Sequence, residues 1–360
     1  MAQIDQLFNA MVGMGASDLH LHEGEPAKVR VHGDIKCITE DILDHDTIHT
    51  MLSEITEPEP WKEFLAGGDL DFAYQMDEDS RFRTNLMKHT GGIGAVFRLI
   101  PTKLCSLEQL GVPLVIKKFA EIRGGVVLVT GPTGSGKSTT LAALMDYMNI
   151  NFSRHIVTIE EPIEFVHRNK MSIITQREVP IQTPDFASGL RAAIREDADV
   201  VLVGEMRDLE TISLALTAAE TGLLVFGTLH TNNARKTVDR IIDVFPAEQQ
   251  PQVRTMLAAS LRGVVAQLLL KRCDGKGRVA TTEILVSNTA VASIIRDGRT
   301  EKLMDVLTAG RGEGMQLMDD SIMGYLSAGV VSPMEAYMKA IDKSRFASFL
   351  PKDSPVATEK

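Results

Sequence analysis

The sequence predicts an α/β protein in two parts, a small α+β domain followed by a larger domain built on a parallel sheet. Beyond residue 124, short apolar runs alternate with long helical stretches, and the runs lie at 126–130, 155–159, 200–203 and 223–229. Continuously apolar runs of this length suit strands that are buried on both faces between helices. Before residue 101 the pattern is mixed, with short alternating segments between helices. A glycine-rich segment with one lysine separates the first apolar run from the helix after it.

The first part, residues 1–103, is expected to form the small α+β domain. We expect helices over 4–14, 47–55 and 60–66, and strands over 18–22, 28–32, 35–38, 69–75, 81–88 and 94–99. Gly33 and Asp34 offer a turn between two of these strands and so predict a hairpin.

The rest of the chain is expected to divide into three segments. Residues 104–123, which contain Gly111 and Pro113, are predicted to be a connector. Residues 124–350 are predicted to form the larger domain, which is helical after residue 287. Residues 351–360 are predicted to be a mobile polar tail.

Composition and charge favour some classes of protein over others. The 360 residues are 44% hydrophobic and 24% charged, as in a water-soluble globular protein, and no apolar run is long enough to cross a membrane. The acidic, polar N-terminus lacks the pattern of a signal peptide, so we expect a cytoplasmic protein without direct membrane insertion. The net charge of −10 argues against nucleic acid as a partner. Cys37, Cys105 and Cys273 form no CxxC pair, so we expect isolated buried thiols.

Residues 131–138, GPTGSGKS, match G-x-x-x-x-G-K-[ST] in full between a predicted strand and a predicted helix. The glycines allow backbone N–H groups to wrap a phosphate at the start of the helix. Lys137 would contact the β- and γ-phosphates of ATP, and Ser138 would place its hydroxyl on Mg²⁺. The predicted nucleotide-binding residues are Gly131, Pro132, Thr133, Gly134, Ser135, Gly136, Lys137, Ser138 and Thr139. A loop that only connects strand to helix is the alternative.

Hydrolysis needs a carboxylate near the phosphates, and two strand ends offer one. Glu160 and Glu164 lie in TIEEPIEF, at 158–165. The alternative for each is an ordinary acid, since this loop contains three acidic residues. Glu205 ends the run VVLVGE, with Gly204 in the place where a Walker B aspartate usually stands. Glu205 could polarise the attacking water or reach the metal through water. Its alternatives are a neighbour of a helix N-cap or a surface acid. His230, at the end of a third strand, could sense the γ-phosphate or be an ordinary satisfied polar group.

Together these segments resemble the secretion ATPase superfamily and, within it, the type IV pilus retraction ATPases. Residues 131–140 resemble the family's Walker A motif, 158–167 its Asp box, 200–211 (VVLVGEMRDLET) its Walker B motif and 221–234 (TGLLVFGTLHTNNA) its His box. SDLH at 17–20 and GMQ at 314–316 also resemble family motifs. The resemblance implies a PAS-like N-terminal domain, a RecA-like ATPase domain and a homohexameric ring.

The resemblance also implies roles for individual residues. Glu205 matches the Walker B glutamate, Glu164 a glutamate near the catalytic water, and His230 the His-box histidine. Three arginines lie in a segment that resembles the family's N-terminal-domain segment that presents arginines to the nucleotide: Arg81, Arg83 and Arg98. The alternative is that they are solvated charges on edge strands. An arginine from a neighbouring subunit would stabilise charge at the phosphates.

Departures from the family's motifs bear on two questions: whether the motor retracts or assembles pili, and whether it is the principal or an accessory ATPase. Glu161 stands where aspartate is common, and residues 290–297 match the retraction motif only in part. The absence of a tetracysteine zinc element favours retraction over assembly or type II secretion. The implied partners are an inner-membrane platform protein of the pilus machine and a paralogous, accessory retraction ATPase. The alternative is that this chain is itself the accessory retraction ATPase. A nucleic-acid translocase and a non-hydrolysing subunit are the remaining hypotheses.

Overall fold

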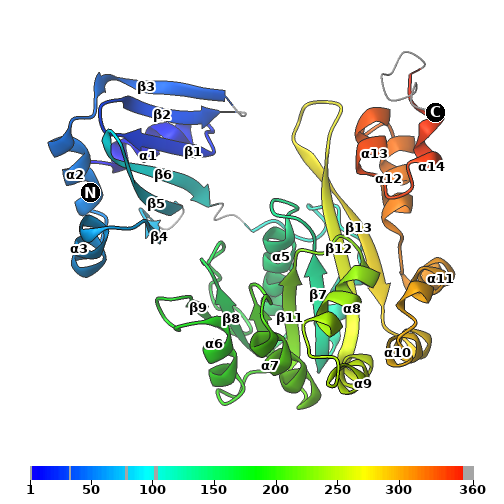
Figure 1. Cartoon of the computed structure of the whole chain (residues 1–360). Helices are drawn as coiled ribbons and strands as arrows, with labels where there is room; N and C mark the ends of the chain where they lie inside the picture. The colour runs from blue at the N-terminus through cyan, green and yellow to red at the C-terminus, as the bar shows by residue number, and fades with distance from the viewer. Residues whose placement is uncertain (1, 32–33, 78–79, 101–103, 352–360) are drawn as a thin grey trace. The chain divides into compact units, whose positions relative to one another are not determined.

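A computed structural model describes residues 2–31, 34–77, 80–100 and 104–351 (Figure 1). The chain divides into two compact units. The first contains residues 1–103 together with 162–166, and the second contains 104–161 together with 167–360. The inclusion of 162–166 in the first unit has no counterpart in the sequence prediction.

Over its described residues, the first unit contains one antiparallel sheet and three helices. Its elements are α1 (Asp5–Gly13), β1 (Asp18–His22), β2 (Pro26–Val31), β3 (Asp34–Ile42), α2 (His45–Ser53), α3 (Pro58–Ala66), β4 (Leu70–Gln75), β5 (Arg81–His89) and β6 (Gly92–Ile100). The strands are arranged in the order β3-β2-β1-β6-β5-β4. The predicted hairpin is confirmed, since β2 pairs with β3 from Val31 and Asp34 outward, while its turn lies outside the described residues. The predicted helices and strands of this unit are confirmed, with shifts of a few residues at their ends.

Alternation along the strands gives this sheet one apolar face, which α1 covers. Leu19 and Val29 face each other on neighbouring strands and are fully buried, whereas the residues next to each along its strand are polar. Phe8 of α1 stacks on Phe82 with ring centroids 4.0 Å apart and meets Phe97 edge-on at 5.0 Å. Because all three rings are fully buried, truncating one to alanine would cost about 3–5 kcal/mol.

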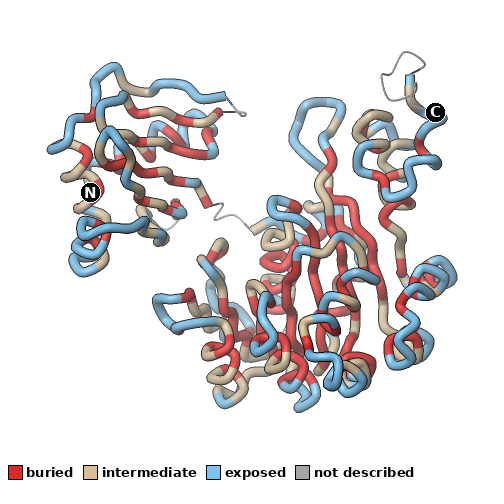
Figure 2. Tube along the Cα trace, in the orientation of Figure 1, coloured by how far each residue is buried: buried red, intermediate tan, exposed pale blue. Residues whose placement is uncertain are grey.

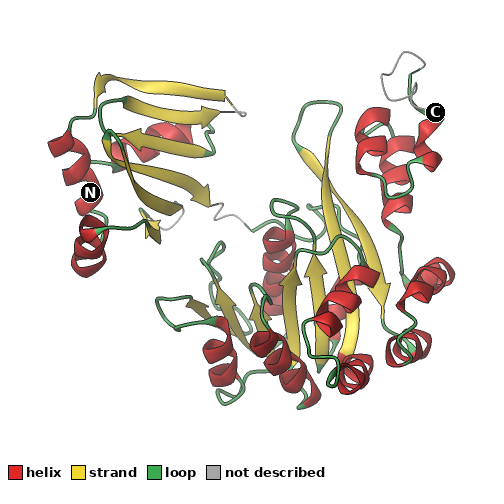
Figure 3. Cartoon of the chain, viewed as in Figure 1, coloured by secondary structure: helices red, strands yellow, loops and turns green. Residues whose placement is uncertain are grey.

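The second unit is a seven-stranded sheet between helices (Figures 1 and 3). Its elements up to the last strand are α4 (Val115–Glu121), β7 (Gly125–Thr130), α5 (Lys137–Asn151), β8 (His155–Glu160), β9 (Ile173–Glu178), α6 (Phe186–Ala193), β10 (Val200–Val203), α7 (Leu209–Glu220), β11 (Leu224–Leu229), α8 (Ala234–Asp243), α9 (Gln250–Ser260), β12 (Leu261–Lys271) and β13 (Arg278–Val286). The order is β13-β12-β7-β11-β10-β8-β9, and every neighbouring pair is parallel except β12 with β13.

The central strands are buried throughout, as Figure 2 shows. Alternate residues face two cores. Val126 and Leu128 pack with α7, α8 and α9, whereas Val127 and Val129 pack with α4 and α5. The segment predicted as a connector contributes to the second core through Leu107, Val112, Ile116 and Phe119, so it packs onto this unit.

Three strands of the second unit are absent from the sequence prediction. β12 follows α9 without an intervening residue, so its apolar run resembles a continuation of the helix. β13 pairs with it, and β9 is a half-buried edge strand with polar residues at its end. Helices after residue 287 were expected and are present: α10 (Thr289–Arg296), α11 (Leu303–Ala309), α12 (Met318–Ser327), α13 (Pro333–Lys339) and α14 (Ser344–Ala347). The predicted tail lies, apart from residue 351, outside the described residues.

The cysteines contradict one expectation from composition. All three cysteines are exposed, so the prediction of buried thiols is wrong. Cys37 lies on the edge strand β3, Cys105 precedes α4, and the Cys273 thiol donates to the Gly329 carbonyl. Within the described parts of the chain, no helix has the length and hydrophobicity needed to cross a membrane.

Candidate nucleotide-binding and catalytic site

The glycine-rich loop joins β7 to α5, and its backbone requires glycine. Gly131, Gly134 and Gly136 have φ values of 144°, 76° and 86°, which side chains disfavour. A Cβ on Gly131 would also lie 2.3 Å from the Gln267 carbonyl oxygen. The loop therefore turns tightly against β12 and delivers its N–H groups to the start of α5, where an anion is stabilised.

Lys137 is the first residue of α5 and directs its ammonium back over the loop. Its Nζ donates to the carbonyl oxygens of Gly131 at 2.8 Å and Pro132 at 3.2 Å. The ammonium group is thus held at the mouth of the loop, where it can move to contact a phosphate. Ser138 follows within the first turn of the same helix.

Gln267 holds the loop in place, and the sequence analysis does not identify it. Its Nε2 donates to the Ser135 carbonyl at 2.8 Å, and its Oε1 accepts from the Thr140 hydroxyl at 2.9 Å. The side chain is buried, so both hydrogen bonds are shielded from water. Gln267 lies on β12, and only recognition of that strand would have placed it beside the loop.

Glu205 follows β10 and is bound by two side chains. The His230 Nε2 lies 2.8 Å from the Glu205 Oε1, and the Arg207 Nη2 donates to Oε2 at 2.6 Å. Burial acts to raise the pKa of Glu205, but hydrogen bonding and charge from Arg207, with a contribution from His230, hold the pKa below its ordinary value. Glu205 is therefore a carboxylate at neutral pH. Arg207 is a second residue missed by the sequence analysis, although it stands only two positions away.

The structure identifies the N-cap of the helix after Glu205 and explains the glycine before it. Asp208, three positions after Glu205, caps α7 by accepting from the Thr211 N–H at 2.8 Å. A Cβ on Gly204 would lie 3.0 Å from the Ile159 carbonyl oxygen and 3.2 Å from the Glu160 Cα, so an aspartate there would require a backbone shift.

Sheet order brings the predicted elements to one edge. β8, β10, β11 and β7 are consecutive parallel neighbours, so their carboxyl ends lie together. The glycine-rich loop follows β7, Glu160 ends β8, Glu205 follows β10 and His230 follows β11. Ligands of open α/β sheets bind at such an edge. Glu160 is held there by the Thr158 hydroxyl at 2.6 Å and the Gln176 amide at 3.2 Å.

The other predicted residues belong to the first unit. Glu164 lies in the segment 162–166, which groups with that unit. The Arg98 Nε donates to the Asp18 Oδ1 at 2.8 Å, and Arg83 is the direct cross-strand partner of Arg98. The Arg81 Nη1 reaches the Gln75 Oε1 at 3.4 Å. All three arginines come from β5 and β6, on the sheet face opposite the apolar core.

The fold and the loop between β7 and α5 define a RecA-like P-loop ATPase. The chain belongs to the family described as type II/IV secretion system protein, which matches residues 1–321. The resemblance inferred from the motifs is thereby confirmed.

Individual relatives narrow the comparison. The type IV pilus retraction ATPase PilT of Pseudomonas aeruginosa is 47% identical over 94% of this chain and 98% of its own. A twitching motility protein of Neisseria gonorrhoeae is 49% identical over 89% of this chain and 86% of its own. The type IV pilus ATPase PilU of Pseudomonas aeruginosa is 35% identical over 94% and 88%. A crystal structure of the pilus retraction motor PilT with bound ADP superposes with a TM-score of 0.89, at 39% identity, over 96% of this chain and 98% of that one.

Proposed function

We propose that this chain is a motor subunit that hydrolyses ATP to power retraction of type IV pili. The observation that carries the proposal is one sheet edge that holds a complete P-loop together with the Glu205–His230 pair. Identity of 47% to a retraction ATPase across nearly the full length of both chains supports the same assignment. The lower identity of 35% to PilU favours the principal over the accessory role.

Each group at the sheet edge has a part in hydrolysis. The Lys137 ammonium moves from the loop carbonyls to the β- and γ-phosphates and neutralises charge that develops there. Glu205, kept ionised by its neighbours, accepts a hydrogen bond from the attacking water and polarises it. His230 donates to Glu205, so it can report loss of the γ-phosphate to α8, which begins four residues later.

Mg²⁺ is the metal that suits these ligands. The described residues contain no cluster of three or more His, Cys, Asp or Glu side chains able to hold an ion. A hydroxyl and a carboxylate, Ser138 and Glu205, are hard oxygen ligands, and Mg²⁺ is usually held by few protein groups plus substrate phosphates. Mg²⁺ would neutralise charge on the phosphates of bound ATP.

Six copies of the chain form the motor in this proposal. The ring acts in the cytoplasm on an inner-membrane platform protein of the pilus machine, alone or with a paralogous retraction ATPase. Arg81, Arg83 and Arg98 act on nucleotide held by a neighbouring copy, and Glu164 acts near the catalytic water. The net charge of −10 weighs against nucleic acid as the moved substrate.

The test is a deletion strain complemented with the unsubstituted gene or with Lys137→Ala. Deletion should increase the number of surface pili and abolish twitching, and only the unsubstituted gene should reverse both. Loss of pili on deletion would identify an assembly motor instead. Retained twitching with more than one retraction ATPase in the cell would identify the accessory role, and DNA-stimulated ATPase activity would identify a translocase.

A further inference from the structure

Asp18 belongs to the SDLH segment at 17–20, to which the proposed mechanism assigns no role. It lies on β1 directly opposite Arg30 of β2 on one side and Arg98 of β6 on the other. Its side chain is only 6% exposed, although it lies on the polar face of the sheet. A carboxylate buried to this extent needs charged or hydrogen-bonding partners.

Three side chains surround this carboxylate. The Arg98 Nε donates to Oδ1 at 2.8 Å, the Ser17 hydroxyl donates to Oδ2 at 2.7 Å, and the Arg30 Nε lies 4.0 Å from Oδ2. Burial acts to raise the pKa of Asp18, but Ser17 and Arg98 outweigh it and hold the pKa below its ordinary value. Asp18 is therefore a fixed negative charge against which an arginine can be oriented.

The row of charges across the sheet is unbalanced. A row of direct cross-strand neighbours runs over β2, β1, β6 and β5 and contains three arginines and one aspartate: Arg30, Asp18, Arg98 and Arg83. Arg98 is anchored through Nε, yet its side chain remains 68% exposed. Such a guanidinium is held on one side and presents its remaining donors to solvent, an arrangement suited to phosphate oxygens.

We propose that Asp18 is a positioning residue that orients Arg98 toward the polyphosphate of a nucleotide bound by a second copy of this chain. This inference rests on the proposed function, in which arginines of the first unit act in trans. A guanidinium fixed before the nucleotide arrives loses less conformational freedom on contact. In this proposal, Asp18 of the SDLH segment acts through Arg98 and contacts neither the nucleotide nor a metal.

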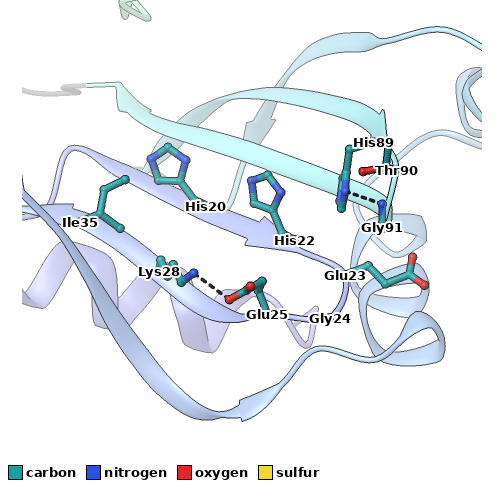
Figure 4. A pocket seen from close by; sticks show the side chains of 10 residues that line it. All are labelled: His20, His22, Glu23, Gly24, Glu25, Lys28, Ile35, His89, Thr90 and Gly91. Carbon is teal, nitrogen blue, oxygen red and sulfur yellow. Dashed lines mark hydrogen bonds and ion pairs between the residues drawn. The ribbon is translucent and has the colours of Figure 1, made fainter.

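A neighbouring ion pair on the same unit supplies a matched control. A hollow of about 560 Å³ lies next to this row. His20, His22 and Lys28 are among the residues that line it, as Figure 4 shows. There the Lys28 Nζ pairs with the Glu25 Oε2 at 2.9 Å. Glu25→Gln removes a carboxylate from an arginine-free ion pair, so it should leave kcat and the KM for ATP unchanged.

The test is steady-state ATPase activity of the full chain as Asp18→Asn, Arg98→Ala and the double variant. Asp18→Asn should lower kcat about tenfold with little change in the KM for ATP, as expected for a group that orients a functional side chain. The double variant should be no slower than Arg98→Ala, because Asp18 acts only through that arginine. An unchanged kcat in Asp18→Asn, or effects that multiply in the double variant, would overturn the inference. Full activity of Arg98→Ala would instead remove the arginine from the proposed function, and the inference with it.

Arg98→Lys keeps the inference testable if Asp18→Asn unfolds the first unit. Lysine keeps the charge but lacks the Nε–H group that Asp18 binds in Arg98. If orientation matters, Arg98→Lys should be as slow as Arg98→Ala. Activity close to that of the unsubstituted protein would show that charge alone suffices and that Asp18 orients nothing of consequence. Thermal unfolding and ADP binding to the intact P-loop check that each variant is folded.

Discussion

Glu205 is bound by a histidine and an arginine, and this environment predicts the effect of a conservative substitution. Glu205→Gln keeps the shape but cannot polarise water as a carboxylate does. We therefore expect kcat to fall about 10²–10⁴-fold while ATP binding persists. Glu210→Gln is the control, because Glu210 is an exposed residue in the first turn of α7 and pairs with Arg191 of α6. A rate unchanged in Glu205→Gln would move the catalytic role to Glu160 or Glu164.

His167 links stability to pH. Burial lowers its pKa to about 4 from 6.5; the charge of Asp146 opposes this shift, and the charge of Lys170 adds a smaller lowering. Between these pH values the unfolded chain binds a proton that the folded chain does not, so stability falls as pH falls. The loss is at most about 3 kcal/mol and is complete only below pH 4. Urea unfolding at pH 7.5 and 5.0 should show a smaller pH effect in His167→Gln than in the unsubstituted chain. Equal pH effects would contradict this cause.

At the scale of elements, Gln267 ties the P-loop to β12 and α5. Gln267→Leu leaves the Ser135 carbonyl and the Thr140 hydroxyl buried without their partner, at a cost of about 1–3 kcal/mol for each group. We expect lower stability and a higher KM for ATP. Adding Thr140→Val removes one orphaned group, so the double variant should lose less than the sum of the single losses. Additive losses would show that the two hydrogen bonds do not act together.

The elements also show how far sequence carries the prediction. The P-loop, Glu205 and His230 were found because each lies in a contiguous motif at the end of an apolar strand. Gln267 was missed because β12 runs on directly from α9, and its partners lie 127 and 132 positions away along the chain. Asp18 was singled out as part of a motif, but only the strand register that pairs β1 with β6 reveals its arginine.

At the scale of the whole molecule, the proposed ring requires residues from two copies at each site. Lys137→Ala subunits and Arg98→Ala subunits should each be nearly inactive. Mixed under conditions of subunit exchange, they can form sites with an intact P-loop and an intact arginine, so part of the ATPase activity should return. Repeating the mixture with Arg81→Ala and Arg83→Ala identifies which arginine acts in trans. Demonstrated exchange without recovery for any of the three would contradict action between copies.

The central claim is that this P-loop hydrolyses ATP, and the direct measurement is steady-state turnover by the purified chain and by Lys137→Ala. Loss of an electrostatic contact to the transferring phosphate should cost roughly 3–4 kcal/mol, so we expect kcat to fall about 10²–10³-fold. Thermal unfolding of the substituted chain checks that it remains folded. A kcat for Lys137→Ala within about threefold of the unsubstituted protein would contradict the assignment of this loop as the catalytic phosphate site.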